Sequence, residues 1–204
     1  TDLTIQAGCL GNVVARLTFA GTSGHAARPW LADSALEKAA RGLLPLFELS
    51  PRPAVVSGLE FVEVVSVTRL EAGIADNVIP GEAVATLNLR YPPDRTPVEA
   101  EAYLRSVCPA GTTLSIESNA PPARVVDSSA VRALQRAGDL EVRPKQAWTN
   151  VADFTTRGID AVNFGPGHTA MAHHPDEHVS IAALVRAYEV LHRFLSSPIG
   201  EDEP

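Results

Sequence analysis

Hydrophobic and polar residues alternate along several stretches of the chain, which is the pattern of strands with one buried face. Residues 13–20 alternate in this way and end in a turn-prone run at residues 21–24. Residues 62–68 are rich in β-branched side chains, residues 85–91 alternate again, and residues 113–117 form a shorter run of the same kind. We therefore expect four strands in this part of the chain.

Two segments with helical spacing lie between these strands. Ser34 and Glu37 have the spacing of a capping box, and the apolar positions behind them, as far as Phe47, predict a helix of about three turns. Prolines at 45, 51 and 53 break this pattern. Residues 96–99 combine a cap, a proline at the first helical position and a box glutamate, which predicts a second helix. The order β-α-β-β-α-β over residues 12–118 predicts an α+β domain with helices on a sheet.

The pattern changes after the proline pair at residues 121–122. Helical and strand-like segments now alternate, as in an α/β domain. We expect a helix at 127–137, a strand at 141–146, a helical turn at 154–157, a strand at 161–164 and a helix at 180–196.

A histidine-rich loop follows the last predicted strand. Residues 168–178 hold four of the six histidines, after a Gly-Pro-Gly run at residues 165–167. Imidazole is a common zinc ligand, and Asp176 and Glu177 add oxygen donors. Pro175 forbids the regular helix of an H-E-x-x-H motif, so other ligands must converge from elsewhere.

Composition limits the classes of partner. The chain has 204 residues, 45% of them hydrophobic, and a formal net charge of -7 without a basic cluster, which argues against a nucleic-acid or anionic-membrane surface. Small molecules or proteins are the expected partners. No apolar run approaches the roughly 20 residues that span a bilayer, and we expect a cytoplasmic protein with reduced, packed thiols at Cys9 and Cys108. Because the chain starts at Thr1, we expect it to be the later part of something longer.

Three motifs resemble signatures of the dinuclear zinc aminoacylase family, which includes succinyl-diaminopimelate desuccinylase, acetylornithine deacetylase and glutamate carboxypeptidases. They are Gly24-His25 before a proline, Asn77-Val78-Ile79-Pro80-Gly81, and the run Gly165-Pro166-Gly167, Ala172-His173, Asp176-Glu177 and Val179. The resemblance covers essentially the whole chain. It implies that residues 1–11 are the end of a catalytic domain or a linker, 12–120 a lid (dimerisation) domain, and 121–204 the C-terminal segment of an α/β catalytic domain.

The resemblance also assigns roles to five residues. His173 matches the last zinc ligand, whereas His25 matches a lid histidine that reaches the partner's active site in a dimer and donates to the developing oxyanion. Asn77, Arg90 and Thr149 match substrate-binding positions, Arg90 as a clamp for a carboxylate. Local alternatives stay open: a locally satisfied turn histidine at His25, an αL turn residue at Asn77 and a solvated strand arginine at Arg90. The other loop histidines, His168, His174 and His178, match nothing fixed and are expected to be exposed.

The family resemblance implies two zinc ions per intact site, with cobalt as a substitute, a homodimer formed through the lid, and an N-acyl amino acid substrate. The Asn88-Leu89-Arg90 string and residues 145–149 favour N-succinyl-L,L-diaminopimelate. Related desuccinylases, however, have aspartate and arginine where this chain has Asn150 and Asp153. If that arginine binds a substrate carboxylate, Asp153 would repel it and change the substrate.

The family's remaining catalytic groups are not found ahead of the lid. These are a His-x-Asp motif, a bridging aspartate and a Glu-Glu pair, and no Glu-Glu pair occurs anywhere in the chain. A zinc site needs three or four ligands, so we expect the 204-residue chain alone to be inactive. The alternatives are a deacetylase-like or carboxypeptidase-like member, an inactive dimerisation or binding module, and a small zinc protein built on the histidine loop.

Overall fold

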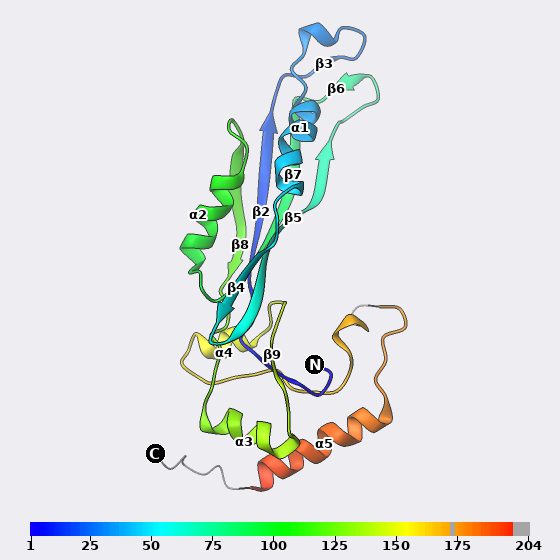
Figure 1. Cartoon of the computed structure of the whole chain (residues 1–204). Coiled ribbons are helices and arrows are strands. Elements are labelled where there is room, and N and C mark those ends of the chain that lie inside the picture. The colour runs from blue at the N-terminus through cyan, green and yellow to red at the C-terminus, as the bar shows by residue number, and fades with distance from the viewer. Residues whose placement is uncertain (172–173, 198–204) are drawn as a thin grey trace. The chain divides into compact units, whose positions relative to one another are not determined.

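The computed structural model describes residues 1–171 and 174–197 (Figure 1). The chain forms two compact units. The first, here called the sheet unit, comprises Leu10–Ala54 and Val62–Pro122. The second, called the loop unit because it carries the histidine loop, comprises Thr1–Cys9, Val55–Phe61 and the described part of 123–204.

The sheet unit is built on a five-stranded sheet. Strand order is β4-β5-β7-β2-β8, and the β5–β7, β7–β2 and β2–β8 pairs are all antiparallel. The strands are β2 (Gly11–Ala20), β4 (Arg52–Val56), β5 (Leu59–Ala72), β7 (Glu82–Tyr91) and β8 (Thr113–Ala120). The four predicted strands are confirmed, and all four are longer than expected. Proline-containing β4 was not predicted.

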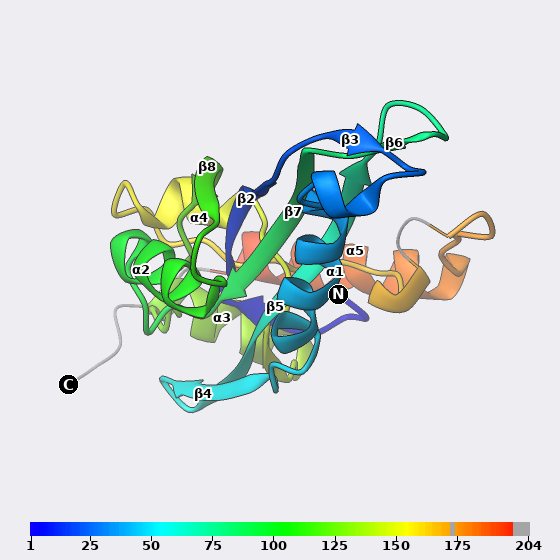
Figure 2. The same cartoon turned by 90° about the horizontal axis from the view of Figure 1, so that it is seen from above.

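Two helices cover one face of this sheet, α1 (Ala35–Phe47) and α2 (Pro97–Val107) (Figure 2). The core between them consists of the inward-facing residues of β2 and β7 and the buried stripes of both helices. The predicted first helix is confirmed, since α1 continues to Phe47. Pro45 lies in the last turn, where it removes one hydrogen bond, and the neighbouring Leu43 and Leu46 are buried and hold that turn in place.

The cap predicted for α2 is confirmed. The Thr96 hydroxyl accepts a hydrogen bond from the Glu99 amide at 3.3 Å, and the Glu99 carboxylate accepts one from the Thr96 amide at 2.8 Å. These reciprocal bonds satisfy two donors that a helix start leaves free. They lower the pKa of the Glu99 carboxyl, chiefly through the bond from the Thr96 amide.

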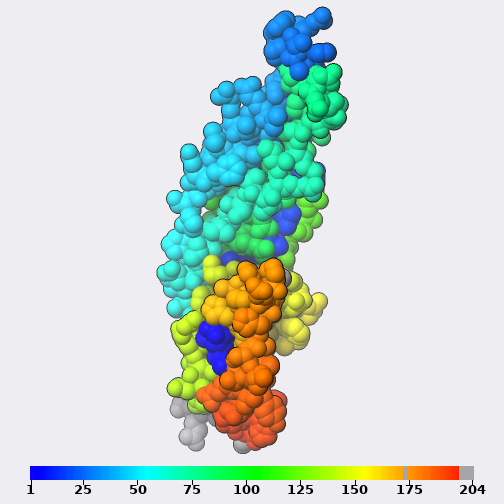
Figure 3. Space-filling model, turned by 90° about the vertical axis from the view of Figure 1, so that its right-hand side faces the viewer, coloured from blue at the N-terminus to red at the C-terminus, as the bar shows by residue number. Residues whose placement is uncertain are grey.

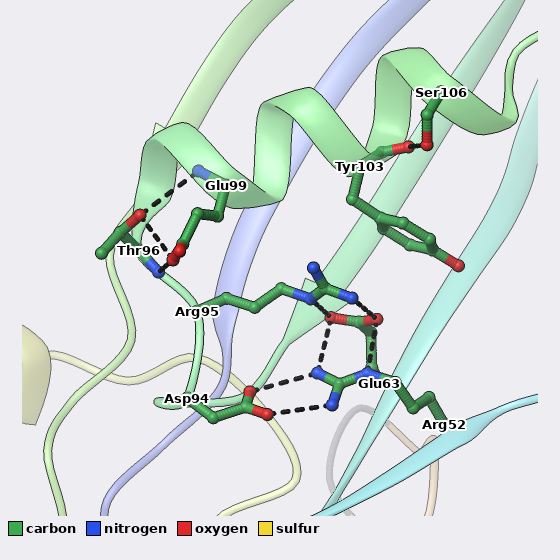
Figure 4. Close-up of polar contacts among 8 residues, drawn as sticks. All are labelled: Arg52, Glu63, Asp94, Arg95, Thr96, Glu99, Tyr103 and Ser106. Carbon is green, nitrogen blue, oxygen red and sulfur yellow. Dashed lines mark hydrogen bonds and ion pairs between the residues drawn. The ribbon is translucent and has the colours of Figure 1, made fainter.

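A buried carboxylate links β4, the strand at one edge of the sheet, to the loop before α2. Glu63 on β5 is a charged residue, yet it lies on the helix-covered face of the sheet and is only 2% exposed. Arg52 of β4 and Arg95 of the β7–α2 loop each bind both of its oxygens, and Arg52 also binds Asp94 (Figure 4). Arg95 lies over the ring of Tyr103 on α2, 4.6 Å from its centroid. The charges of this cluster balance.

The loop unit is mixed α/β. A parallel pair joins β1 (Ile5–Ala7) to β9 (Val142–Pro144), and the helices are α3 (Ser129–Gly138), α4 (Val151–Thr155) and α5 (Ile181–Ser196). α3 and α5 pack on each other and share a core with Ile5 and Val142. β9 and the three helices lie close to their predicted positions, while β1 was not predicted. The mixed α/β fold class is confirmed.

One predicted element of the loop unit is wrong. Residues 161–164 do not form a strand, because they make only a single antiparallel bridge between Asn163 and Gln6. The side chain of Asn163 donates a hydrogen bond to the hydroxyl of Thr149. Across the described residues, no helix is long and apolar enough to cross a membrane.

Candidate functional site

The structure places His25 and Asn77 next to each other at one end of the sheet unit. Strand β3 (Gly24–His25) pairs with β6 (Val78–Ile79), His25 opposite Val78, and the Asn77 carbonyl accepts a hydrogen bond from the Ala26 amide at 2.9 Å. In the space-filling view the blue segment containing β3 and the green segment containing β6 lie side by side at the tip (Figure 3). Both side chains are exposed.

The ring of His25 is held in one orientation. Its Nδ1 accepts a hydrogen bond from the Ala27 amide at 3.0 Å, so the proton of the neutral ring is on Nε2. Gly24 allows the close approach of this loop, because a Cβ there would lie 2.6 Å from the Cβ of Ala32. The result is an exposed N–H donor at the tip of the unit.

Arg90 lies at the opposite end of the same sheet. It occupies β7 on the face that the helices leave open, eight residues beyond Glu82, which is a distance of about 27 Å along the strand. Glu82 is the end of β7 that leads back to β6. One copy of the chain therefore does not bring Arg90 together with His25 and Asn77.

Among the described residues, the guanidinium of Arg90 has one hydrogen-bond partner, the side-chain amide of Asn88. Its Nε donates to Oδ1 of Asn88 at 2.8 Å, and the Asn88 amide donates in turn to Oδ1 of Asn12 at 2.8 Å. Burial lowers the pKa of Arg90, and within residues 1–171 and 174–197 no carboxylate forms an ion pair with it. An uncompensated, half-buried cation is costly unless something else supplies the opposite charge.

Thr149 lies in the loop unit, immediately before α4. Its hydroxyl accepts a hydrogen bond from Nδ2 of Asn163 at 3.2 Å, and its carbonyl lies 3.8 Å from the sulfur of buried Cys9. Asn150 and Asp153, the two departures from the related desuccinylases, contact each other, since the Asn150 amide donates to the Asp153 carboxylate at 3.3 Å. Asp153 is exposed.

The predicted zinc ligand His173 lies outside the described residues. Of the other loop histidines, His168 lies 4.0 Å from the carboxylate of Asp2, and Nδ1 of His178 lies 2.7 Å from the Asp176 carbonyl. In the part of the chain that the structure describes, no three histidine, cysteine or acidic side chains converge on a common point. The sequence also contains one His-x-Asp string, His174-Pro175-Asp176, in this loop after the lid.

Lys145 entered the sequence analysis only as part of the string 145–149, and the structure places its side chain beside this loop. It lines a hollow of about 420 Å³ together with His168, Thr169, Glu177 and His178. Burial lowers the pKa of the Lys145 amine. Its position directly after β9, and the presence of only one other lysine in the chain, were the available signals.

Comparisons with known proteins agree with this architecture. The profile of the peptidase dimerisation domain matches residues 10–111. The putative succinyl-diaminopimelate desuccinylase of Mycobacterium tuberculosis is 36% identical over 94% of this chain and 54% of its own length. The succinyl-diaminopimelate desuccinylase of Corynebacterium glutamicum is 31% identical, again over 94% and 54%. The chain thus spans about half the length of these relatives.

Solved structures share the fold. The crystal structure of an M20 family metallo-carboxypeptidase from Sulfolobus solfataricus superposes with a TM-score of 0.69 at 18% identity, covering 95% of this chain and 60% of that one. Half of the present chain matches the dimerisation profile, and both desuccinylase relatives align along nearly all of it. The chain therefore belongs to the M20 metallopeptidase family and carries its peptidase dimerisation domain.

Proposed function

We propose that this chain supplies the lid and the C-terminal catalytic segment of a longer, zinc-dependent amidohydrolase. Its reaction is the hydrolysis of N-succinyl-L,L-diaminopimelate to succinate and diaminopimelate in the cytoplasm. The support is family membership, the names of the two desuccinylase relatives, which are about twice as long, and the Asn-x-Arg string at residues 88–90. The lid is residues 12–120, and residues 121–204 belong to the catalytic domain.

One observation carries the proposal, namely the separation of the lid residues along the sheet. His25 and Asn77 lie beyond the Glu82 end of β7, and Arg90 lies about 27 Å along that strand from Glu82, too far to bind one small substrate together with them. Two copies of the chain that run in opposite directions bring the tip of one sheet to the Arg90 end of the other. The active site is then shared between two subunits.

Each of these residues has a role in the shared site. Arg90 binds a substrate carboxylate through its free terminal nitrogens, and Asn77 donates to the substrate. The Nε2 proton of His25, from the partner subunit, points to the amide oxygen that becomes negative when water attacks. Thr149 is the substrate-binding residue that we assign to the catalytic segment.

Zinc supplies the Lewis acid that activates water in such enzymes. The described residues do not form a zinc site by themselves, because no three possible ligands among them converge. We assign His173 as the ligand from this chain and leave the other ligands and the general base to the preceding half of the protein.

The surface that joins two copies is proposed to be the outer edge of β5 together with α1. β4 has five residues and β5 fourteen, so most of this edge has no neighbouring strand in the described chain. Beside it lies an apolar groove of about 290 Å³ between α1 and β5, lined by Phe47 and Leu70, which are 63% and 41% exposed. The opposite edge, β8, carries mainly polar exposed residues. An unpaired edge flanked by apolar side chains suits strand pairing with a second copy.

Subunit mixing tests the proposal. In the full-length protein, His25→Ala and Arg90→Ala should each abolish most desuccinylation, because each removes one half of both sites. Mixed dimers carry one site with neither change, so an equimolar mixture should recover roughly a quarter of the wild-type rate. No recovery after verified subunit exchange would contradict a shared site. Arg16→Ala, on the same open face, is the matched control and should keep wild-type activity.

Two further assays bear on substrate and completeness. The full-length protein is offered N-succinyl-diaminopimelate, N-acetylornithine and a C-terminal glutamate peptide, and the account expects the succinyl amide to be cleaved fastest. A preference for either other substrate would favour the deacetylase-like or carboxypeptidase-like alternative.

The 204-residue chain with added zinc should show no turnover. Turnover would contradict the need for further ligands.

A further inference from the structure

We infer that Asn88, held in place by Asn12, is a positioning and specificity-determining residue for the guanidinium of Arg90. The neutral amide fixes the orientation of the cation without neutralising it, which prepares this face of the sheet for a carboxylate. The inference rests on the proposed role of Arg90 in binding substrate. It adds Asn88 and Asn12 as the residues that orient the Arg90 guanidinium and leave its positive charge uncompensated.

The three side chains form a directed chain of hydrogen bonds across two strands. Asn12 of β2 lies opposite Arg90 of β7 in the sheet register, and Asn88 precedes Arg90 by two residues on the same face. Nε of Arg90 donates to Asn88 at 2.8 Å, and the amide of Asn88 donates to Asn12 at 2.8 Å. Each amide thus has one defined direction, because a flipped Asn88 would present a donor to the guanidinium.

This arrangement occupies one side of the guanidinium and leaves its end free. With Nε bound to Asn88, the two terminal nitrogens have no hydrogen-bond partner in the described residues, and they form the fork that binds both oxygens of a carboxylate. Val64 on β5 lies opposite Arg90 on its other side, and its side chain cannot accept a hydrogen bond. The geometry therefore favours an end-on carboxylate.

The charge of Arg90 distinguishes it from the other partly buried arginines of the sheet unit. Arg52 and Arg95 share the carboxylate of Glu63, and Arg52 also pairs with Asp94, so two cations are balanced by two carboxylates. Arg90 has only the neutral amide of Asn88. An aspartate at position 88 would accept the same Nε–H bond, but it would cancel the positive charge that attracts an anionic ligand.

The test uses the 204-residue chain itself and succinate as the probe. The Nε–Hε signal of Arg90 in a ¹⁵N NMR spectrum, assigned by its loss in Arg90→Ala, is followed during titration. Wild type should show a saturable shift with succinate and none with neutral succinamide. Asn88→Asp should weaken succinate binding at least tenfold while Nε–Hε stays hydrogen-bonded. Asn88→Ala and Asn12→Ala should weaken it roughly fivefold, the worth of one hydrogen bond.

The outcomes separate this inference from the proposed function. If Asn88→Asp or Asn12→Ala, with a native spectrum elsewhere, bound succinate as tightly as wild type, the positioning role would be overturned and that of Arg90 would stand. If the backbone amide shifts of Arg90→Ala showed that it binds succinate unchanged, or if wild type gave no saturable shift, the carboxylate role of Arg90 would fail, and this inference with it. Arg16→Gln on the exposed part of the same face should leave binding unchanged.

Discussion

Replacement of Glu63 by glutamine should destabilise the chain more than any other conservative change of an acidic residue in the sheet unit. Glu63 is 2% exposed and accepts four hydrogen bonds, two from Arg52 at 3.0 and 3.2 Å and two from Arg95 at 2.6 and 3.2 Å. Glutamine keeps the shape of the side chain. It removes the negative charge and turns an N–H₂ group toward one of the arginines.

The size of the effect follows from the exposure of the partners. Removing one member of a buried ion pair costs about 3 to 5 kcal/mol. The side chains of Arg52 and Arg95 are 37% and 24% exposed, and Asp94 still balances Arg52, so the lower end of that range applies. We expect a loss of about 3 kcal/mol, which lowers the melting temperature of a chain of this length by roughly 10 °C.

Thermal and urea unfolding followed by circular dichroism measure this loss. Glu60→Gln, an exposed acid on the same strand, is the matched control and should change stability by less than about 0.5 kcal/mol. Replacing Glu63, Arg52 and Arg95 together by methionine should recover most of the loss, because no buried charge is then left unpaired. Unfolding of Glu63→Gln at the wild-type temperature would refute the reasoning.

Four further changes test other parts of the structure. Burial raises the pKa of Tyr91 to about 12 from 10.0, so stability should fall as the pH rises through this window; Tyr91→Phe should lack that fall in melting curves across the range. Burial lowers the pKa of the Lys145 amine below 10.5, so stability should rise as the pH approaches 10.5; Lys145→Met should remove the rise and melt higher at neutral pH, whereas the ion-paired Lys38→Met should not. Gly11→Ala places a Cβ 2.3 Å from the Tyr91 ring and should cost at least about 2 kcal/mol by denaturation. Gly58→Ala, with φ +79° and open space, should cost about 1 kcal/mol.

Periodicity predicted the long elements of the fold because each buries one face over several residues. The reciprocal cap of α2 was also readable, since Thr96 and Glu99 have a fixed spacing. β1 and β9 have three residues each, and they pair although they lie far apart in the sequence. A strand as short as β1 carries no periodic signal. Glu63 shows a different limit: a charged residue on the core face contradicts the simple alternation, and only its two arginine partners explain its burial.

The candidate site was predictable as residues but not as an arrangement. Motifs named His25, Asn77 and Arg90, whereas their separation along the sheet depends on strand register. The contact from Asn88 to Arg90 joins residues two apart on one strand, which alternation places on one face without fixing the direction of the amide. The functional roles of Thr149 and the other predicted site residues remain predictions.

The mass of the chain in solution tests the central claim most directly, because a site shared between lids requires two copies. Sedimentation equilibrium should give twice the 21.6 kDa chain mass, and Leu70→Arg at the outer edge of β5 should reduce it to a single chain without loss of fold. The exposed Leu195→Arg on α5 should leave the mass unchanged. A wild-type chain that stays at 21.6 kDa at every concentration would contradict the account.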